Sequence, residues 1–342
     1  MSTAMGVAVV VVAGLIMGSS AWPIKLMRRF EYEHWAFIAM LGALIVIPWT
    51  VTLLFCPNCF RAYASVDSAV LVKSNLFSLG WGIANVLSLM CLIRIGFCLT
   101  GGILTGIGVS LGVSIPMFFK ASGLFRNAPD LTSRAGLTVL AGVAVMLVGV
   151  VFASLAGFGR DNARQKTQQR KGSFLVGFIM VVIAGILSCG ISFAFVYSQG
   201  PIVEAMKAQG AADIPANFAV WAVGLLAGAA VNVLYPAWLM TKNKSWHVLG
   251  RAGKELLLAP IIAVNMSVAI ALMGKGMILL GVLGASVGFG IQQAMQMTGA
   301  QGVGFISGEW TGITGTPRKR MYLAIGILII AALIMAYGNS LA

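Results

Sequence analysis

Ten long apolar stretches divide this chain of 342 residues, and they restrict its fold more than any other feature. Most hold about 20 residues or more, which as a helix is enough to cross a hydrocarbon core of roughly 30 Å. None alternates apolar and polar residues as a barrel strand does. The sequence therefore predicts an all-α integral membrane protein with ten transmembrane helices, at about 4–22, 35–55, 70–92, 97–119, 134–156, 173–197, 215–240, 256–274, 279–306 and 321–340.

The composition supports a membrane protein and argues against other classes. Only 9% of the residues are charged, whereas a soluble domain has about a quarter, so these charges cannot cover a soluble surface. The net charge of +14 comes from short basic runs between apolar stretches, which argues against a nucleic-acid partner and leaves lipid as the surrounding partner. The first stretch follows no basic residue and shows no Ala-x-Ala cleavage site, so we expect a retained span.

The distribution of Lys and Arg predicts the orientation. Of the 23 basic residues, 16 fall in the odd-numbered loops between the expected spans. The positive-inside rule places these loops in the cytoplasm, so with ten spans both termini are expected in the periplasm. The most basic loop divides the chain into 1–156, a basic cytoplasmic linker at 157–172, and 173–342.

A short apolar phrase occurs twice. AGLIMGSSAW at 13–22 lies in the first expected span, and AGILSCGISF at 184–193 lies in the sixth. Because five spans separate them, the two copies cross the bilayer in opposite directions. Two inverted five-helix repeats around a midplane site are a common architecture of secondary transporters. Chance similarity between two apolar helices remains the alternative.

Several stretches together carry a resemblance to a known family. They are PIKLMRRFEYEHW at 23–35, the Pro48-Trp49 pair, WGIANVLSLMCLIRIGFCLTGGILTGIGVSLGVSIP at 81–116, KGSFLVGFIMVVIAGILSCGISFAF at 171–195 leading to Pro201 and Glu204-Ala205, Gly308-Glu309-Trp310 and the final GNSLA. In their order and spacing the chain resembles the L-rhamnose–proton symporter family of the drug/metabolite transporter superfamily. The resemblance implies a ten-helix carrier in the inner (plasma) membrane, with a sugar or deoxysugar as cargo and a proton as coupling ion.

The chain departs from that family in one region. The family has many aromatic residues and an acidic residue in its eighth and ninth spans. Here residues 265–296 read NMSVAIALMGKGMILLGVLGASVGFGIQQAMQ, with Phe289 the one aromatic and no acid. A carrier for a different small polar metabolite, sodium-coupled or uncoupled, is therefore the alternative.

A neutral sugar offers hydroxyls and apolar C–H patches, so its site should combine uncharged hydrogen-bonding groups with aromatic faces. Gln292 and Gln296 are four residues apart and share one helix face. Polar residues inside a bundle also serve as hydrogen bonds between helices, which is the alternative role for this set. The expected substrate-binding residues are Trp81, Asn85, Ser188, Ser192, Trp221, Asn232, Asn265, Gln292 and Gln296.

The proton carrier is harder to assign, because all nine acidic residues lie near the ends of expected spans. Glu33, Glu204 and Glu309 are the candidates, since each lies in a stretch that matches the family. Glu33 is the foremost, at the cytoplasmic mouth beside Arg28 and Arg29. Helix capping or pairing with nearby Lys and Arg is the alternative for all three.

An enzyme is not expected, since the sequence has no cluster of acids, no set of metal ligands and no nucleophile with a base. No cofactor, metal or ATP-binding motif is expected, so a gradient would drive transport. Cys56-Pro57-Asn58-Cys59 lies at the expected outer end of the second span, and either two free thiols or a local disulfide fits this position.

Overall fold

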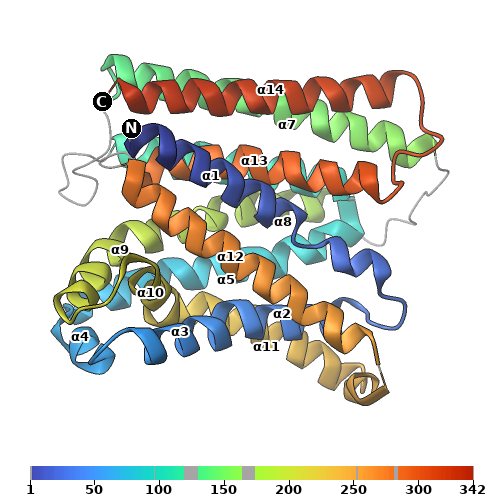
Figure 1. Ribbon diagram of the computed structural model, residues 1–342. Helices are drawn as coiled ribbons and strands as arrows, with labels where there is room; N and C mark the ends of the chain where they lie inside the picture. The colour runs from blue at the N-terminus through green and yellow to red at the C-terminus, as the bar shows by residue number, and fades with distance from the viewer. Residues whose placement is uncertain are drawn as a thin grey trace.

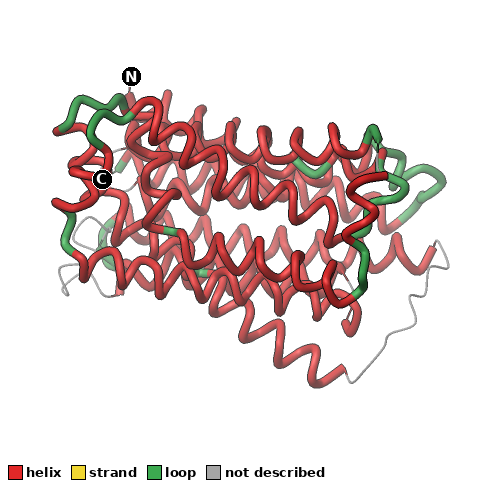
Figure 2. The backbone as a smooth tube through the Cα atoms, turned by 90° about the horizontal axis from the view of Figure 1, so that it is seen from below, coloured by secondary structure: helices red, strands yellow, loops and turns green. Residues whose placement is uncertain are grey.

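The structure is a computed structural model that describes residues 2–95, 97–118, 130–163, 174–251, 253–280 and 284–341. Within these ranges every regular element is helical, which confirms the all-α prediction (Figure 1). The helices lie side by side along one common direction, and both chain ends lie at the same end of the bundle (Figures 1 and 2).

The first part of the chain, up to residue 163, forms these elements in order: α1 (Ser2–Ser19), the 3-10 turn η1 (Trp22–Leu26), α2 (Tyr32–Leu41), the π turn η2 (Gly42–Val46), α3 (Ile47–Phe55), α4 (Cys59–Ser65), α5 (Ser68–Ile95), α6 (Phe97–Phe118) and α7 (Arg134–Ala163).

The second part forms α8 (Phe174–Ser188), α9 (Gly190–Ala208), α10 (Asp213–Ala219), the π turn η4 (Val220–Gly224), α11 (Leu226–Lys242), the 3-10 turn η5 (Trp246–Arg251), α12 (Glu255–Leu280), α13 (Gly284–Ile306) and α14 (Thr316–Ser340).

Seven helical segments of the described chain are long and apolar enough to span a membrane, and an eighth is added if one bent pair counts as a single span. That pair is Asp213–Gly224 with Leu226–Lys242, bent by 65°. The fourth and ninth expected spans, α6 and α13, are not among these segments. The apolar part of α6, Thr100–Ile115, is too short. Helix α13 carries four glutamines, which make it less apolar. The chain is therefore a multi-pass helical membrane protein.

Two π turns interrupt the bundle in matching places. The turn Gly42–Val46 joins α2 to α3, and the turn Val220–Gly224 joins α10 to α11. The two turns contact each other, while α2 packs on α11 and α3 packs on α10. A π turn widens a helix locally and frequently marks a functional position. Here each turn faces the middle of the bundle.

Close helix packing depends on glycine at the contact between α1 and α13. A Cβ atom at Gly14 would lie 2.6 Å from the carbonyl oxygen of Gln292, and one at Gly18 would overlap the carbonyl oxygen of Gln296. Small residues let helix backbones approach closely in a membrane, where packing rather than the hydrophobic effect drives association. These glycines hold the polar face of α13 against α1.

Gly18→Ala is expected to lower stability by about 1–3 kcal/mol, because the added methyl group meets backbone atoms that cannot move aside without shifting α1. The measurement is the thermal midpoint of the purified protein in detergent. Gly302→Ala is the matched control, since nothing lies within 4 Å of a Cβ at that position. Equal midpoints for the two variants would contradict this account of the contact.

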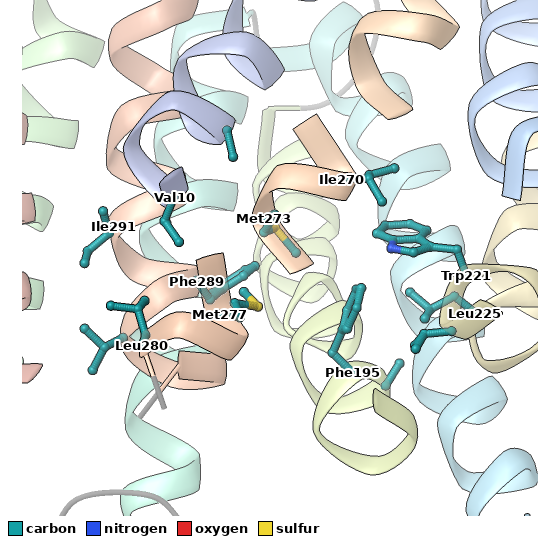
Figure 3. Packing of buried hydrophobic residues seen from close by; sticks show 14 of the residues in the cluster. Val10, Phe195, Trp221, Leu225, Ile270, Met273, Met277, Leu280, Phe289 and Ile291 are labelled. Atoms are coloured by element: carbon teal, nitrogen blue, oxygen red, sulfur yellow. The ribbon is translucent and has the colours of Figure 1, made fainter. Parts of the chain in front are cut away.

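The buried apolar core runs along the bundle and surrounds a central space. Figure 3 shows Phe195, Trp221 and Met273 gathering from three different helical segments, with Phe289 and Met277 beside them. Aromatic and methionine side chains together fill such irregular space well, because methionine is flexible. The core therefore also forms much of the wall of the cavity described next.

Candidate functional site

A cavity of about 370 Å³ lies in the middle of the bundle, between helices from both parts of the chain. Eight of the nine residues predicted from the sequence line it, namely Trp81, Asn85, Ser188, Ser192, Trp221, Asn232, Gln292 and Gln296. Asn265 is half-buried on α12 and does not line the cavity. The structure thus gathers side chains that are up to 215 positions apart in the sequence, from Trp81 to Gln296.

Two pairs of amide side chains form the polar wall. Asn85 on α5 donates from Nδ2 to Oδ1 of Asn232 on α11 over 2.9 Å. One turn apart on α13, Gln292 donates from Nε2 to Oε1 of Gln296, also over 2.9 Å. Within the described part of the chain, the Oε1 atom of Gln292 and the Nε2 atom of Gln296 have no protein partner. One acceptor and one donor are therefore open to a ligand.

Aromatic rings form another part of the wall. Trp221, in the π turn of the second part, meets Trp81 edge to face at 6.2 Å between centroids and Phe195 at 5.2 Å. Trp221 is only 4% exposed, so these contacts fix its ring. Leu44, in the π turn of the first part, also lines the cavity. The two π turns thus each place a side chain on the wall.

The sequence analysis missed an apolar part of the wall. The additional lining residues include Tyr32 and five methionines, Met17, Met40, Met266, Met273 and Met277. The three methionines of α12, with Ile270 between them, follow a spacing of four, three and four residues, which places them on one helix face. That spacing is a signal from which this face could have been predicted.

A second chamber, of about 400 Å³, adjoins the first, and Thr105, Gln293 and Gln296 line both. It is lined by Lys25 of η1, Arg160 near the end of α7, and Glu309 in the turn after α13. We call it the inner chamber, because these elements lie at the end of the bundle where the basic loops gather. The Lys25 side chain is 47% exposed, so solvent reaches this chamber.

The inner chamber contains an ion cluster that joins the two parts of the chain. Arg160 Nη1 lies 2.7 Å from Glu309 Oε2, and Lys25 Nζ pairs with Glu309 Oε1. Both cations precede residue 164 and the carboxylate follows residue 173. A displacement of one part against the other would therefore separate Glu309 from both cations.

The other candidate carboxylates lie outside both cavities. Glu33 is 8% exposed, and its Oε1 accepts hydrogen bonds from Asn243 Nδ2 at 3.0 Å and Ser245 Oγ at 3.4 Å. Glu204 is exposed on α9. Of the three carboxylates predicted as proton carriers, only Glu309 lines one of these two cavities.

Glu255 is a buried acid that the sequence analysis did not single out. Its carboxylate accepts from the backbone N–H groups of Arg28, Arg29 and Phe30 at 2.7, 2.9 and 2.7 Å. Three hydrogen bonds to a charged acceptor compensate its burial. Glu255 thus joins the start of α12 to the segment after η1 and has a structural role.

Cys56 and Cys59 are free, buried thiols in the structure, which decides between the two alternatives from the sequence. Burial, together with the neighbouring Cys59, raises the pKa of the Cys56 thiol to about 11. At neutral pH it is therefore a thiol and not a reactive thiolate.

Comparison with known proteins now identifies the family. The family model for the L-rhamnose-proton symport protein (RhaT) matches residues 1–250, nearly three quarters of the chain. The chain belongs to the L-rhamnose-proton symport protein family. The resemblance predicted from the sequence is thereby confirmed.

Curated members of the L-rhamnose-proton symport protein family are similar over a shorter range. L-rhamnose-proton symporters of Yersinia pestis and of Yersinia pseudotuberculosis serotype I are each 28% identical over 215 residues. The match covers 62% of this chain and 60% of each relative, so the chain spans less than two thirds of their length. The family match ends at residue 250, so Gln292, Gln296 and Glu309 lie beyond it.

Proposed function

We propose that the chain is a secondary active transporter that imports a sugar or deoxysugar, L-rhamnose or a close analogue, by proton symport across the inner membrane. Family membership and the names of the curated relatives support this. In this proposal the cargo binds in the central cavity, and movement of the two parts of the chain exposes it to either side in turn.

The observation that carries the proposal is the chemistry of the cavity wall. None of the described residues that line the central cavity is charged. Amides and hydroxyls can both donate to and accept from sugar hydroxyls, while Trp81, Trp221 and the methionines offer apolar faces to C–H groups. A 6-deoxyhexose such as L-rhamnose has a methyl group in place of the hydroxymethyl group, and this mixed wall suits it. A volume of about 370 Å³ lies within the usual range for small-molecule sites.

We further propose that the bundle consists of two inverted five-helix repeats, 1–156 and 173–342, joined by the linker 157–172. The pattern of helix contacts supports this. The first helix of each half packs on the third and fourth helices of the other half, α1 on α12 and α13, and α8 on α5 and α6. The fifth helices α7 and α14 pair with each other, and so do α2 and α11 of the second spans.

The repeated apolar phrase supports the same relation at residue level. Gly6 lies against the last turn of α12, and Gly177 lies against the last turn of α5. Eight residues later, within the phrase itself, Gly14 lies against α13 and Gly185 against α6. Each pair of glycines is 171 positions apart, as are the two copies of the phrase, so corresponding positions of α1 and α8 make equivalent contacts.

The relative directions of neighbouring helices support the proposal of ten membrane crossings. The glycine contacts show that α1 runs antiparallel to α12 and parallel to α13, and that α8 runs antiparallel to α5 and parallel to α6. Successive membrane crossings alternate in direction. If α6 and α13 are the fourth and ninth of ten crossings, the expected directions of these helices are the ones observed. We therefore include α6, whose apolar segment is short, and α13, which is less apolar, as the fourth and ninth crossings.

Single cysteines placed at residue 2 and at residue 165 of a cysteine-free variant are expected to react with an impermeant label from opposite sides of the membrane. Residue 165 lies in the basic linker, outside the described residues, and the excess of basic residues places this linker in the cytoplasm. The measurement compares labelling of intact cells with labelling of inverted vesicles. Reaction of both positions from the same side would contradict the ten-crossing arrangement with periplasmic termini.

Glu309 is proposed as the proton carrier, in preference to Glu33 and Glu204. Its place on the wall of the inner chamber supports this, because a proton carrier must communicate with the transport route. Two cations beside a carboxylate favour its ionised form, so this conformation corresponds to the state that has released its proton to the cytoplasm. In the proposed conformation that is open to the other side, the two halves separate and Lys25 and Arg160 move away from Glu309. The Glu309 carboxylate then binds a proton more readily.

The direct test is uptake of a panel of labelled sugars into proteoliposomes with and without an imposed pH gradient. Accumulation of L-rhamnose or a related deoxysugar that requires the gradient supports the proposal. Uptake that never responds to a pH gradient, in the protein without substitutions, would replace proton symport by a sodium-coupled or uncoupled carrier. Preference for a different class of metabolite would replace the proposed cargo.

A further inference from the structure

We propose that the corner of the bundle where α11 ends and α12 begins binds an anionic phospholipid. Its phosphate lies at Lys242 and Lys244, and one acyl chain runs along Trp238 and Leu234. This goes beyond the proposed function, because it concerns the lipid side of the protein and not the transport route. The corner lies at the same end of the bundle as the inner chamber (Figure 1). Three observations lead to it: positive charge without a neutralising carboxylate, two exposed tryptophans, and their alignment on one helix face.

The corner carries a surplus of positive charge. The segments 28–33 and 242–255 contain six basic residues and three acids, a net charge of +3 with His247 neutral. All six basic side chains are exposed. Within the described part of the chain, none of them lies within 4 Å of a carboxylate. Basic residues at the edge of a membrane attract anionic lipid headgroups, so this charge favours such a partner.

The three acids of these segments are occupied by neutral donors. Glu255 accepts from three backbone N–H groups, and Glu33 accepts from two uncharged side chains. Glu31 forms a capping box with His34 at the start of α2. Glu33 and Glu255 are also buried. The lysines and arginines therefore stay available to a ligand that approaches from the lipid side.

Two exposed tryptophans mark the depth of this corner in the membrane. Trp238 of α11 is 52% exposed and Trp246 of η5 is 43% exposed. The Trp238 ring stacks on Tyr235 at 5.8 Å between centroids, and Trp246 Nε1 donates to Thr241 Oγ1 over 3.0 Å. Tryptophan concentrates at the boundary between hydrocarbon and headgroups, because its ring is apolar with one polar group. The basic residues next to these rings therefore lie at the level of the headgroups.

The groups that a phospholipid needs align on one face of α11. Leu234, Trp238 and Lys242 follow each other at intervals of four residues, and all three are exposed. Lys242 Nζ lies 5.0 Å from the centroid of the Trp238 ring, and this cation–π contact holds the ammonium group against the helix. The face thus runs from an apolar side chain through an amphipathic ring to a cation. A phospholipid has the matching order, from acyl chain through glycerol to phosphate.

Lys244 supplies the second cation, in the turn that ends α11. Its φ of 52° belongs to a tight turn, which the backbone N–H of Ser245 closes by donating to the carbonyl oxygen of Met240 over 2.9 Å. This turn keeps Lys244 at the same end of the helix as Lys242. A zwitterionic headgroup brings a cation of its own, which these lysines repel. An anionic headgroup has no such cation, so the corner should select it.

The test compares phosphatidylglycerol with phosphatidylcholine that carries the same acyl chains. Native mass spectrometry of the purified full chain in detergent measures how tightly the first lipid of each kind binds. Phosphatidylglycerol is expected to bind at least twentyfold more tightly. Lys242→Gln and Lys244→Gln should each reduce this preference about fivefold, the effect of one basic residue beside an anionic lipid. Lys73→Gln, at an exposed lysine near the start of α5, is the matched control and should change nothing.

Trp238→Leu separates a defined site from a general charge effect. The substitution removes the ring that holds Lys242 but leaves every charge in place, so it should reduce the preference for phosphatidylglycerol several-fold. Without added lipid, the thermal midpoints of all these variants should stay within a few degrees of each other, because the substituted side chains are exposed. An equal loss of preference in Lys73→Gln would mean that net charge alone determines lipid binding, which would overturn the proposal.

A soluble competitor distinguishes a lipid from a free phosphate ester. Glycerol 3-phosphate, the headgroup without acyl chains, should not displace phosphatidylglycerol, and displacement would replace the lipid by a soluble ligand. Equal binding of the two lipids, or an unchanged preference in a folded variant with both Lys242→Gln and Lys244→Gln, would also overturn the proposal. L-rhamnose binding in the same preparations should not change, so the proposed function is tested separately from this inference.

Discussion

Glu309→Gln is expected to abolish sugar accumulation driven by a pH gradient and to leave exchange of labelled for unlabelled sugar largely intact. Glutamine retains the size and polarity of the side chain but cannot bind and release a proton. Exchange needs no net proton movement, so it should survive. A gradient of one pH unit corresponds to about 1.4 kcal/mol per proton, or tenfold accumulation at one proton per sugar. The accumulation ratio in proteoliposomes should fall from about ten to about one.

Two control variants make this result specific. Glu204→Gln changes an exposed carboxylate away from both cavities and should leave tenfold accumulation. Glu33→Gln keeps an acceptor oxygen for Asn243 and Ser245 but replaces two charge-assisted hydrogen bonds by weaker neutral ones, so it should lower the yield of folded protein while the surviving fraction still accumulates sugar. Normal accumulation in Glu309→Gln, together with its loss in Glu33→Gln, would transfer the proton site to Glu33.

The ion cluster also gives a physical reason for coupling sugar and proton. In the described conformation Glu309 joins the two halves of the chain through Lys25 and Arg160. In the proposed alternating-access mechanism, opening the other side of the carrier would separate these groups, and a separated carboxylate binds a proton more readily. Protonation would in turn remove the attraction that pulls the halves back. Under this proposal, proton binding and the conformational change are linked by one equilibrium.

The apolar runs of the sequence predicted the helices well, because a segment in lipid must satisfy its backbone groups internally. They did not predict the π turns Gly42–Val46 and Val220–Gly224 or the break at Cys189. These features arise where helices from the two halves pack against each other. The contacting residues are far apart in sequence, so no local pattern reveals them.

The residues of the candidate site could likewise be predicted from the sequence only where a single helix fixes their positions. Gln292 and Gln296 could be placed on one face from their spacing alone, since a helix fixes that relation. Asn265, which the sequence also predicted to bind substrate, does not line the central cavity, because the cavity face of α12 carries Met266, Ile270 and Met273, and Asn265 lies about 100° away from Met266. The partner of Glu309 could not be predicted either, because Lys25 is 284 positions away.

Gln292→Leu is expected to weaken binding of the transported sugar by about tenfold, which makes it the largest single effect on the central cavity. Leucine has a similar volume but cannot accept a hydrogen bond, and the Oε1 atom of the largely buried Gln292 is one of the groups open to a ligand. Loss of one neutral hydrogen bond costs about 0.5–1.5 kcal/mol, and the sugar hydroxyl left unpaired in a closed cavity adds to this. Isothermal titration of the purified protein measures the change.

Asn265→Leu is the matched control, because it removes an amide of similar size from α12 without altering the wall of the cavity. Its sugar affinity should equal that of the chain without substitutions, and its thermal midpoint should match that of Gln292→Leu within a few degrees. Equal weakening by both substitutions would mean that the loss comes from general loosening of the bundle. Unchanged affinity in a folded Gln292→Leu variant would remove Gln292 from the site and leave Asn85 and Asn232 as the polar groups that hold the sugar.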